Sequence, residues 1–264
     1  MFVARVLGFG LCAPGLRDFP TFVRWLRDAS QLLPAGRSAQ PSAAGLAPTE
    51  WRRAPHAVRL AVDVASQATT NGRGAVGAVF CSAFGDMANT DVILTTLAHA
   101  PLEISPIRFT HSVHNAAAGH WSIMAASHAP TTALACGREG VGAAMLTALL
   151  EADRGHEPQL LVCSDAADAG ALGDAACCDS DFAVALLLGA EHGNPGAPLL
   201  RGAVRMGQAQ AAPPRDARLR PWWEGNPAAR LLPLIEGCLQ AGQQGFTLPL
   251  GSGTLLAIDC EAPN

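Results

Sequence analysis

Residues 131–150 read TTALACGREGVGAAMLTALL, and this stretch belongs to the most informative part of the sequence. Its first five residues predict a short strand that ends at Cys136, and an alanine-rich helix is expected over residues 139–152. A cysteine at the amino end of a helix has a lowered pKa, because the helix dipole and the free backbone amides stabilise its thiolate. Nucleophilic cysteines of acyl-transfer enzymes are built in this way. A buried structural cysteine at this position fits the same pattern equally well.

Two uninterrupted apolar runs of strand length follow this helix, QLLVCS at residues 159–164 and FAVALLL at residues 182–188. Such runs predict strands that are buried on both faces, as in a sheet covered by helices. Because strands and helices alternate along the rest of the chain, we expect a layered α/β fold. The other predicted strands cover residues 2–8, 75–81 and 254–259, and the other predicted helices cover residues 18–29, 55–70, 88–98, 116–127 and 228–241. Residues 8–15, 34–50, 100–115 and 189–230 are rich in turn-forming residues and predict turns and loops.

The composition excludes several classes of protein. Of the 264 residues, 49% are hydrophobic and 15% are charged, which excludes a disordered chain. A net charge of −4 argues against a nucleic-acid-binding protein, since phosphate recognition requires a basic face. All 18 basic residues are arginine and there is no tyrosine, so Schiff-base lysines, P-loop lysines and tyrosine acids are excluded.

The apolar amino terminus predicts a first strand rather than a signal peptide. It has no basic segment ahead of its apolar run, and Gly8, Gly10 and Pro14 interrupt it. No window reaches 18 uninterrupted apolar residues, so no membrane-spanning helix is predicted. The eight cysteines form no CxxC pair and lie mostly in apolar runs, so we expect buried thiols in a cytoplasmic protein.

Four histidines gather in one part of the chain, at positions 111, 114, 120 and 128. His111 and His114 have a spacing that allows both to face one metal ion, but no Asp, Glu or Cys lies nearby to complete a ligand set. We therefore expect a structural or hydrogen-bonding role, with no metal site and no cofactor. The chain also has no Gly-x-Ser-x-Gly motif, which argues against an α/β-hydrolase.

Taken together, these segments resemble the amino-terminal half of a β-ketoacyl synthase, which has a thiolase-like helix/sheet/helix fold. FVARVLGFGLCAPG resembles the opening strand and turn of that family, and SPIRFTHSVHNAAAGHWSI resembles its segment of proline, asparagine and small-residue helix. The stretch quoted first resembles the nucleophile elbow, with Cys136 at the nucleophile's position. QLLVCSDAAD and DFAVALLLGAE resemble the two strands after it, and the resemblance covers roughly residues 1–190.

The chain departs from this family at the elbow and in its second half. The family's elbow is usually Ala-Cys-x-Ser-Gly, whereas here Arg138 and Glu139 take the places of serine and glycine. Synthases carry two catalytic histidines in their second half, which stabilise developing negative charge, whereas His192 is the one histidine after residue 160. We expect a single domain over residues 1–264, with a complete amino-terminal half at 1–192 and an abbreviated carboxyl-terminal part at 193–264. Only GFTLPLGSGTLLAID in that part resembles the family's carboxyl-terminal hairpin.

A shortened synthase-like chain without the histidine pair resembles the chain-length-factor partners of heterodimeric ketosynthases, including short members from aryl polyene (xanthomonadin-type) pigment clusters. The resemblance implies a non-catalytic subunit in fatty-acid or polyketide-type biosynthesis. It would bind a full-length ketosynthase subunit and act through it on chains held by an acyl carrier protein. The resemblance places the dimer interface on the strand before the elbow, at Thr131, Thr132, Ala133, Leu134 and Ala135.

Two alternatives remain open at this point. The chain is a stand-alone cysteine acyltransferase or hydrolase if Cys136 is paired with a nearby histidine, and a degenerate thiolase-like scaffold if it takes part in no catalytic complex. The first alternative requires a histidine within hydrogen-bond reach of the thiol. The candidate pocket residues are His111, His114, Asn115, His120 and Arg138.

Overall fold

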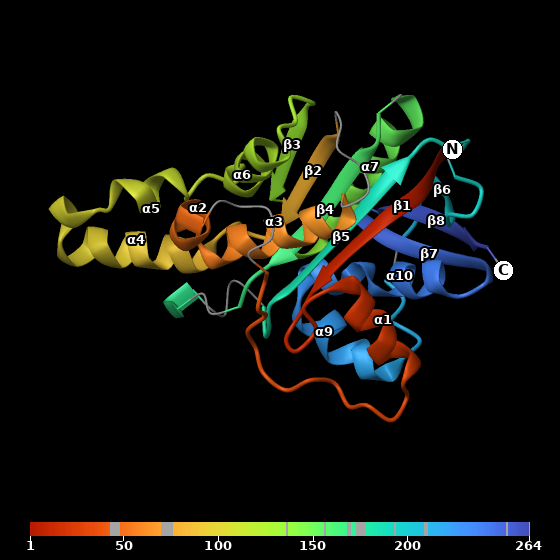
Figure 1. Ribbon diagram of the computed structural model, residues 1–264, viewed down its shortest axis with the longest axis horizontal. Helices are drawn as coiled ribbons and strands as arrows, with labels where there is room; N and C mark the ends of the chain where they lie inside the picture. The colour runs from red at the N-terminus through yellow and green to blue at the C-terminus, as the bar shows by residue number, and fades with distance from the viewer. Residues whose placement is uncertain are drawn as a thin grey trace.

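The computed structural model of the chain describes residues 1–42, 48–69, 76–135, 137–155, 157–167, 170–172, 178–192, 194–208, 211–251 and 253–263 (Figure 1). Cys136 therefore lies outside the described residues. Within them, the strands form one eight-stranded sheet in the order β3-β2-β4-β5-β1-β6-β8-β7. The strands are β1 (Phe2–Cys12), β2 (Gly77–Ser82), β3 (Thr131–Ala135), β4 (Gln159–Asp165), β5 (Phe182–Gly189), β6 (Leu199–Met206), β7 (Gly242–Gly251) and β8 (Thr254–Ala262).

The strands near the elbow are parallel, and the remainder are antiparallel. β2 pairs in parallel with both β3 and β4, whereas every other pairing in the sheet is antiparallel. β3 is consequently an edge strand, paired on one side only. The helices are α1 (Phe19–Arg27), α2 (Pro48–Arg53), α3 (His56–Ala68), α4 (Met87–His99), α5 (Pro106–Thr110), α6 (Ala116–Ala125), α7 (Gly140–Arg154), α9 (Arg220–Gly225) and α10 (Leu232–Leu239).

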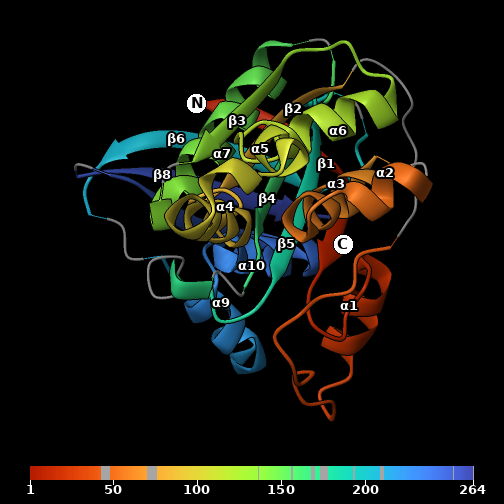
Figure 2. The same cartoon turned by 90° about the vertical axis from the view of Figure 1, so that its left-hand side faces the viewer.

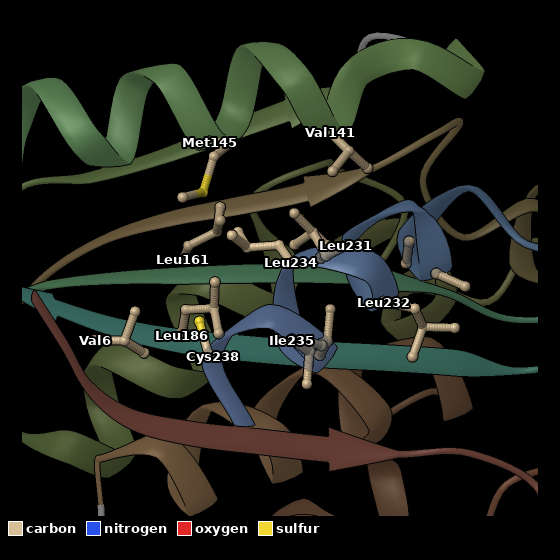
Figure 3. Close-up of a cluster of buried hydrophobic side chains, with 14 of the residues drawn as sticks. Val6, Val141, Met145, Leu161, Leu186, Leu231, Leu232, Leu234, Ile235 and Cys238 are labelled. Carbon is tan, nitrogen blue, oxygen red and sulfur yellow. The ribbon is translucent and has the colours of Figure 1, made fainter. Parts of the chain in front are cut away.

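Helices cover both faces of the sheet, which confirms the predicted layered α/β fold. Alternate residues of β4 point to opposite faces, so Leu160 packs in the cluster under α3 and α6, and Leu161 packs in the cluster under α7 and α10. Figure 3 shows the second cluster, in which Met145 of α7 points toward Leu161. Every residue of β5 is buried, as its uninterrupted apolar run predicted.

A local signal in the sequence explains where α1 begins. Asp18 precedes α1 and accepts a hydrogen bond from the backbone N–H of Thr21 at 2.7 Å, which is the expected capping role. The described cysteines are buried, which agrees with their predicted burial: Cys12, Cys81, Cys163, Cys178, Cys238 and Cys260. No described helix has both the length and the apolar character needed to cross a membrane.

Three predictions about turns and loops are wrong. The predicted loop over residues 100–115 contains the short helix α5. β1 does not end at Gly8 but continues to Cys12, because α3 packs directly on the strand. A Cβ at Gly8 or Gly10 would lie 2.2 Å or 2.0 Å from a backbone oxygen of α3, so these glycines permit close packing rather than a turn. The predicted loop over residues 189–230 contains β6 and α9, and β6 is stabilised by pairing with β1 and β8.

Candidate functional site

The turn after β3 is the part of the structure closest in sequence to the predicted nucleophile. β3 ends at Ala135, and a 3₁₀ turn, η2 (Gly137–Glu139), leads into α7. Gly137 has a φ of +67°, a left-handed conformation that favours glycine, and its N–H donates to the carbonyl oxygen of Ala83 at 3.0 Å. The predicted strand, turn and helix are therefore present on either side of position 136.

A cavity of about 400 Å³ lies beside the amino end of α7 and is lined by Arg138 and Glu139. Leu248 and Pro249 of β7 form another part of its wall, and Trp223 and Arg230 complete it from α9 and the 3₁₀ turn η5 (Pro227–Leu231). This volume falls in the range of small-molecule pockets in proteins. The cavity is thus large enough for an organic ligand.

The three candidate histidines, His111, His114 and His120, lie away from this cavity, at or beside a smaller one. His111 and His114 line a cavity of about 50 Å³ together with Asp86, and the His111 ring stacks on His120 with 5.2 Å between centroids. Burial and the charge of His120 lower the pKa of His111, although Asp86 acts in the opposite direction. A cavity of this size holds a few water molecules and is well below the size of a ligand pocket.

The structure therefore separates the five candidate pocket residues. Arg138 lines the cavity beside α7, whereas His111, His114 and His120 belong to the group at the smaller cavity. Asn115 precedes α6 and is exposed. The first alternative function requires one of these histidines close to Cys136, whose side chain is outside the described residues.

A histidine–aspartate pair that the sequence did not reveal lies at a third cavity, of about 430 Å³. The distance from His56 Nε2 to Asp181 Oδ2 is 2.6 Å, and the backbone N–H groups of Ala39 and Ala167 also donate to this carboxylate. Burial acts to raise the pKa of Asp181, but the His56 and backbone hydrogen bonds outweigh it and lower the pKa overall. The two residues are 125 positions apart, so no local pattern could have predicted the pair.

A buried carboxylic acid also lies at the end of β4. Asp165 is 6% exposed, and its Oδ1 accepts a hydrogen bond from the backbone N–H of Ala83 at 2.7 Å. Burial raises the pKa of Asp165 to about 7, although backbone hydrogen bonds from Ala83 and Ala228 act to lower it. The buried Asn226 side chain donates to the backbone oxygens of Asp165 and Ser180, which ties β4 to the segment after α9.

The edge strand β3 lies next to an apolar surface. Thr131, Thr132 and Ala135 are exposed, and Ala133 and Leu134 are partly buried. Figures 1 and 2 show α4 and α5 extending together from the body of the molecule on the side of α6, and α6 lies beside β3. This apolar arm, from Phe84 to Ile123, carries large exposed hydrophobic side chains at Phe84, Val92, Leu94, Leu97, Leu102, Ile107, Phe109, Val113 and Ile123.

Comparisons with solved structures identify the same fold in ketosynthase complexes. A chain of the ketosynthase (ApeO) in complex with its chain length factor (ApeC) from Xenorhabdus doucetiae is 22% identical over 98% of this chain and 99% of that chain, with a TM-score of 0.73. A chain of the ishigamide ketosynthase/chain length factor is 12% identical over 100% of both chains, with a TM-score of 0.64. A chain of AntDE:AntF, a type II PKS acyl-carrier protein in complex with its ketosynthase bound to the hexaketide, is 11% identical over 99% of both chains, with a TM-score of 0.73.

Comparisons based on sequence gave one match, to a family model. No curated protein sequence matches the chain. The family model of the β-ketoacyl synthase amino-terminal domain, however, matches residues 25–221, which is well over half of the chain. This range includes β3, the turn at η2 and α7, the elements that surround the position of the nucleophile. The chain therefore belongs to the β-ketoacyl synthase family.

Proposed function

We propose that this chain is a chain-length-factor-like subunit of a heterodimeric β-ketoacyl synthase and is not catalytic on its own. Its partner is a full-length ketosynthase subunit, and the complex acts in the cytoplasm on chains carried by an acyl carrier protein. Two of the similar structures are complexes of a ketosynthase with a chain length factor, and a third contains an acyl-carrier protein with its ketosynthase. These relatives support a pathway of polyketide or fatty-acid type, and we favour an aryl polyene product.

The observation that carries this proposal is the exposed edge strand β3 beside the apolar arm. An unpaired strand edge is an aggregation hazard unless another chain or element covers it, and a large exposed apolar patch marks an interaction surface. Thr131, Thr132 and Ala135 are exposed on this edge, and Ile123 of the neighbouring α6 is 73% exposed. A partner subunit that covers both β3 and the arm would remove this exposed surface from water.

The sequence supports the non-catalytic part of the proposal. His192 is the one histidine after residue 160, and it lies exposed in the turn that follows β5. Family members that condense acyl chains place two histidines beside the nucleophile to stabilise negative charge, and this chain offers no matching pair in its second half. Decarboxylation and condensation would therefore take place on the partner subunit.

The test compares two charge substitutions during co-expression with a ketosynthase subunit. Ile123→Glu places a carboxylate on the apolar arm, and we expect at least a tenfold loss of co-purified partner. Leu32→Glu is the matched control, because Leu32 is 85% exposed but lies after α1, away from the arm. Its partner recovery should equal that of the wild type.

Catalytic assays complete this test. The purified chain alone should not condense malonyl and acyl thioesters above background, whereas the complex should. Condensation by the chain alone would return the cysteine acyltransferase alternative to first place. Equal partner recovery for Ile123→Glu and the wild type would contradict an interface on this arm, and failure of any ketosynthase to co-purify would favour the scaffold alternative.

A further inference from the structure

The cavity of about 400 Å³ beside α7 is lined by two arginines, Arg138 and Arg230, and by one carboxylate, that of Glu139. Among the residues that the structure describes, no carboxylate lies within salt-bridge distance of Arg138 or Arg230. Elsewhere on this chain, Arg201 and Arg218 form close ion pairs with Glu261 and Asp216. The two cavity arginines therefore differ from arginines that form close ion pairs, although Glu139 lies in the same wall.

Arg230 is held in a partly buried position. Its guanidinium carbon lies 4.1 Å from the centroid of the Trp223 ring, which fixes the side chain at the cavity wall by a cation–π contact. Burial lowers the pKa of Arg230, the positive charge of Arg138 lowers it further, and Glu224 and Glu139 act in the opposite direction. The lowering factors prevail, so the surroundings disfavour the positive charge on Arg230, and an anion in the cavity would relieve this cost.

Most of the rest of the wall is suited to an apolar group. Val141, Leu248 and Pro249 contribute apolar surface, and the ring of Trp223 adds an aromatic wall. The indole Nε1 of Trp223 is buried and has no hydrogen-bond acceptor among the described residues. Buried indole N–H groups normally have a partner, so this donor differs from most buried indoles.

We infer that this cavity binds an oxyanion joined to an apolar group, with Arg138 and Arg230 at its charged end. The ligand class is a carboxylate or a phosphate ester with an alkyl or aryl substituent, because both offer oxygens that arginine donates to. The inference rests on the cavity alone and does not depend on the proposed heterodimer.

The test is a calorimetric titration of the full chain, with its partner where the two co-purify, using three probes that share an eight-carbon tail. Octanoate and octyl phosphate carry an anion, and octanol does not. We expect the better of the two anions to bind at a single site at least tenfold more tightly than octanol. A preference for octyl phosphate would identify a phosphate ester, and a preference for octanoate would identify a carboxylate.

Arginine variants locate the binding to this cavity. Arg230→Gln should weaken binding of the preferred anion at least tenfold, and Arg230→Lys should retain part of it by keeping the charge. Arg154→Gln, an exposed arginine at the opposite end of α7, should bind as the wild type does. If circular dichroism shows that Arg230→Gln is misfolded, Arg138→Gln decides, because Arg138 is exposed.

Three results would overturn the inference. They are octanol binding as tightly as both anions, folded arginine variants keeping the wild-type affinity, and failure of the wild type to bind either anion at millimolar concentration. Because these readouts need no condensation activity, their failure is separate from a failure of the proposed function.

Discussion

Asp165 is the residue whose environment has the clearest consequence for stability. Its carboxyl group is buried at the end of β4 with a pKa raised from 3.8 to about 7. The folded state therefore binds the Asp165 proton more tightly than the unfolded state does. As pH rises from about 4 to about 7, this group lowers the free energy of unfolding by up to about 1.4 kcal/mol per pH unit, and above that range its effect is constant.

Asp165→Asn should remove this pH dependence. The asparagine side chain keeps an acceptor for the N–H of Ala83 but does not ionise. We expect the variant to gain stability relative to the wild type between pH 5 and pH 8 in urea denaturation. Asp259→Asn, on the exposed part of β8, is the control and should follow the wild-type profile. Parallel profiles for Asp165→Asn and the wild type would contradict a raised pKa at Asp165.

Cys136 is the second residue with a specific prediction, although its own placement is outside the described residues. Arg138 and Glu139, which replace the family's small residues, line the cavity beside α7, and the histidines lie at a different cavity. We therefore expect Cys136→Ala to leave the activity of the reconstituted complex within about threefold, which is under about 1 kcal/mol of barrier. A large rate loss, or an acyl adduct on Cys136 by intact mass measurement, would show that this cysteine reacts.

At the scale of elements, the packing of α7 against β7 depends on one glycine. A Cβ at Gly142 would lie 2.1 Å from the carbonyl oxygen of Pro249, so the helix and the strand are in direct backbone contact. Gly119 in α6 also occupies a helix, but a Cβ there would meet no atom within 4 Å. The two glycines therefore separate the effect of packing from the effect of helix propensity.

Alanine substitutions at these two positions should change stability in opposite directions. Gly142→Ala should destabilise the chain by about 1–3 kcal/mol, because overcrowding at Pro249 outweighs the gain in helix propensity. Gly119→Ala should raise the free energy of unfolding by up to about 1 kcal/mol, the usual preference for alanine over glycine in a helix. Urea denaturation of both variants measures the difference, and an equal response would contradict close packing at Gly142.

At the scale of the whole molecule, the exposed β3 edge and the apolar arm predict an obligate complex. We expect a dimer interface of more than about 2,000 Å² in total, the size typical of permanent complexes. Light scattering of the purified chain without its partner should show self-association or aggregation at micromolar concentration. A soluble and monodisperse monomer under these conditions would contradict the predicted interface.

The layered fold and the segment that surrounds the elbow could be predicted from the amino-acid sequence alone. The apolar runs of β4 and β5 predicted buried strands, and Asp18 predicted the start of α1. The order of Thr131–Ala135, the turn and α7 was also evident from residues 131–150. These features depend on contacts between near neighbours in the chain, on the periodicity of apolar residues and on capping, so a local pattern is sufficient to predict them.

Features that depend on distant segments of the chain became visible in the folded structure and not in the sequence. Gly8 was predicted to begin a turn, but the approach of α3 keeps it within β1. The pair of His56 and Asp181 joins residues 125 positions apart, and the cavity of Arg138 and Arg230 joins α7 to the segment after α9. The physical reason is that burial, close backbone approach and the pKa of a buried group are set by long-range packing, which leaves no local signal in the sequence.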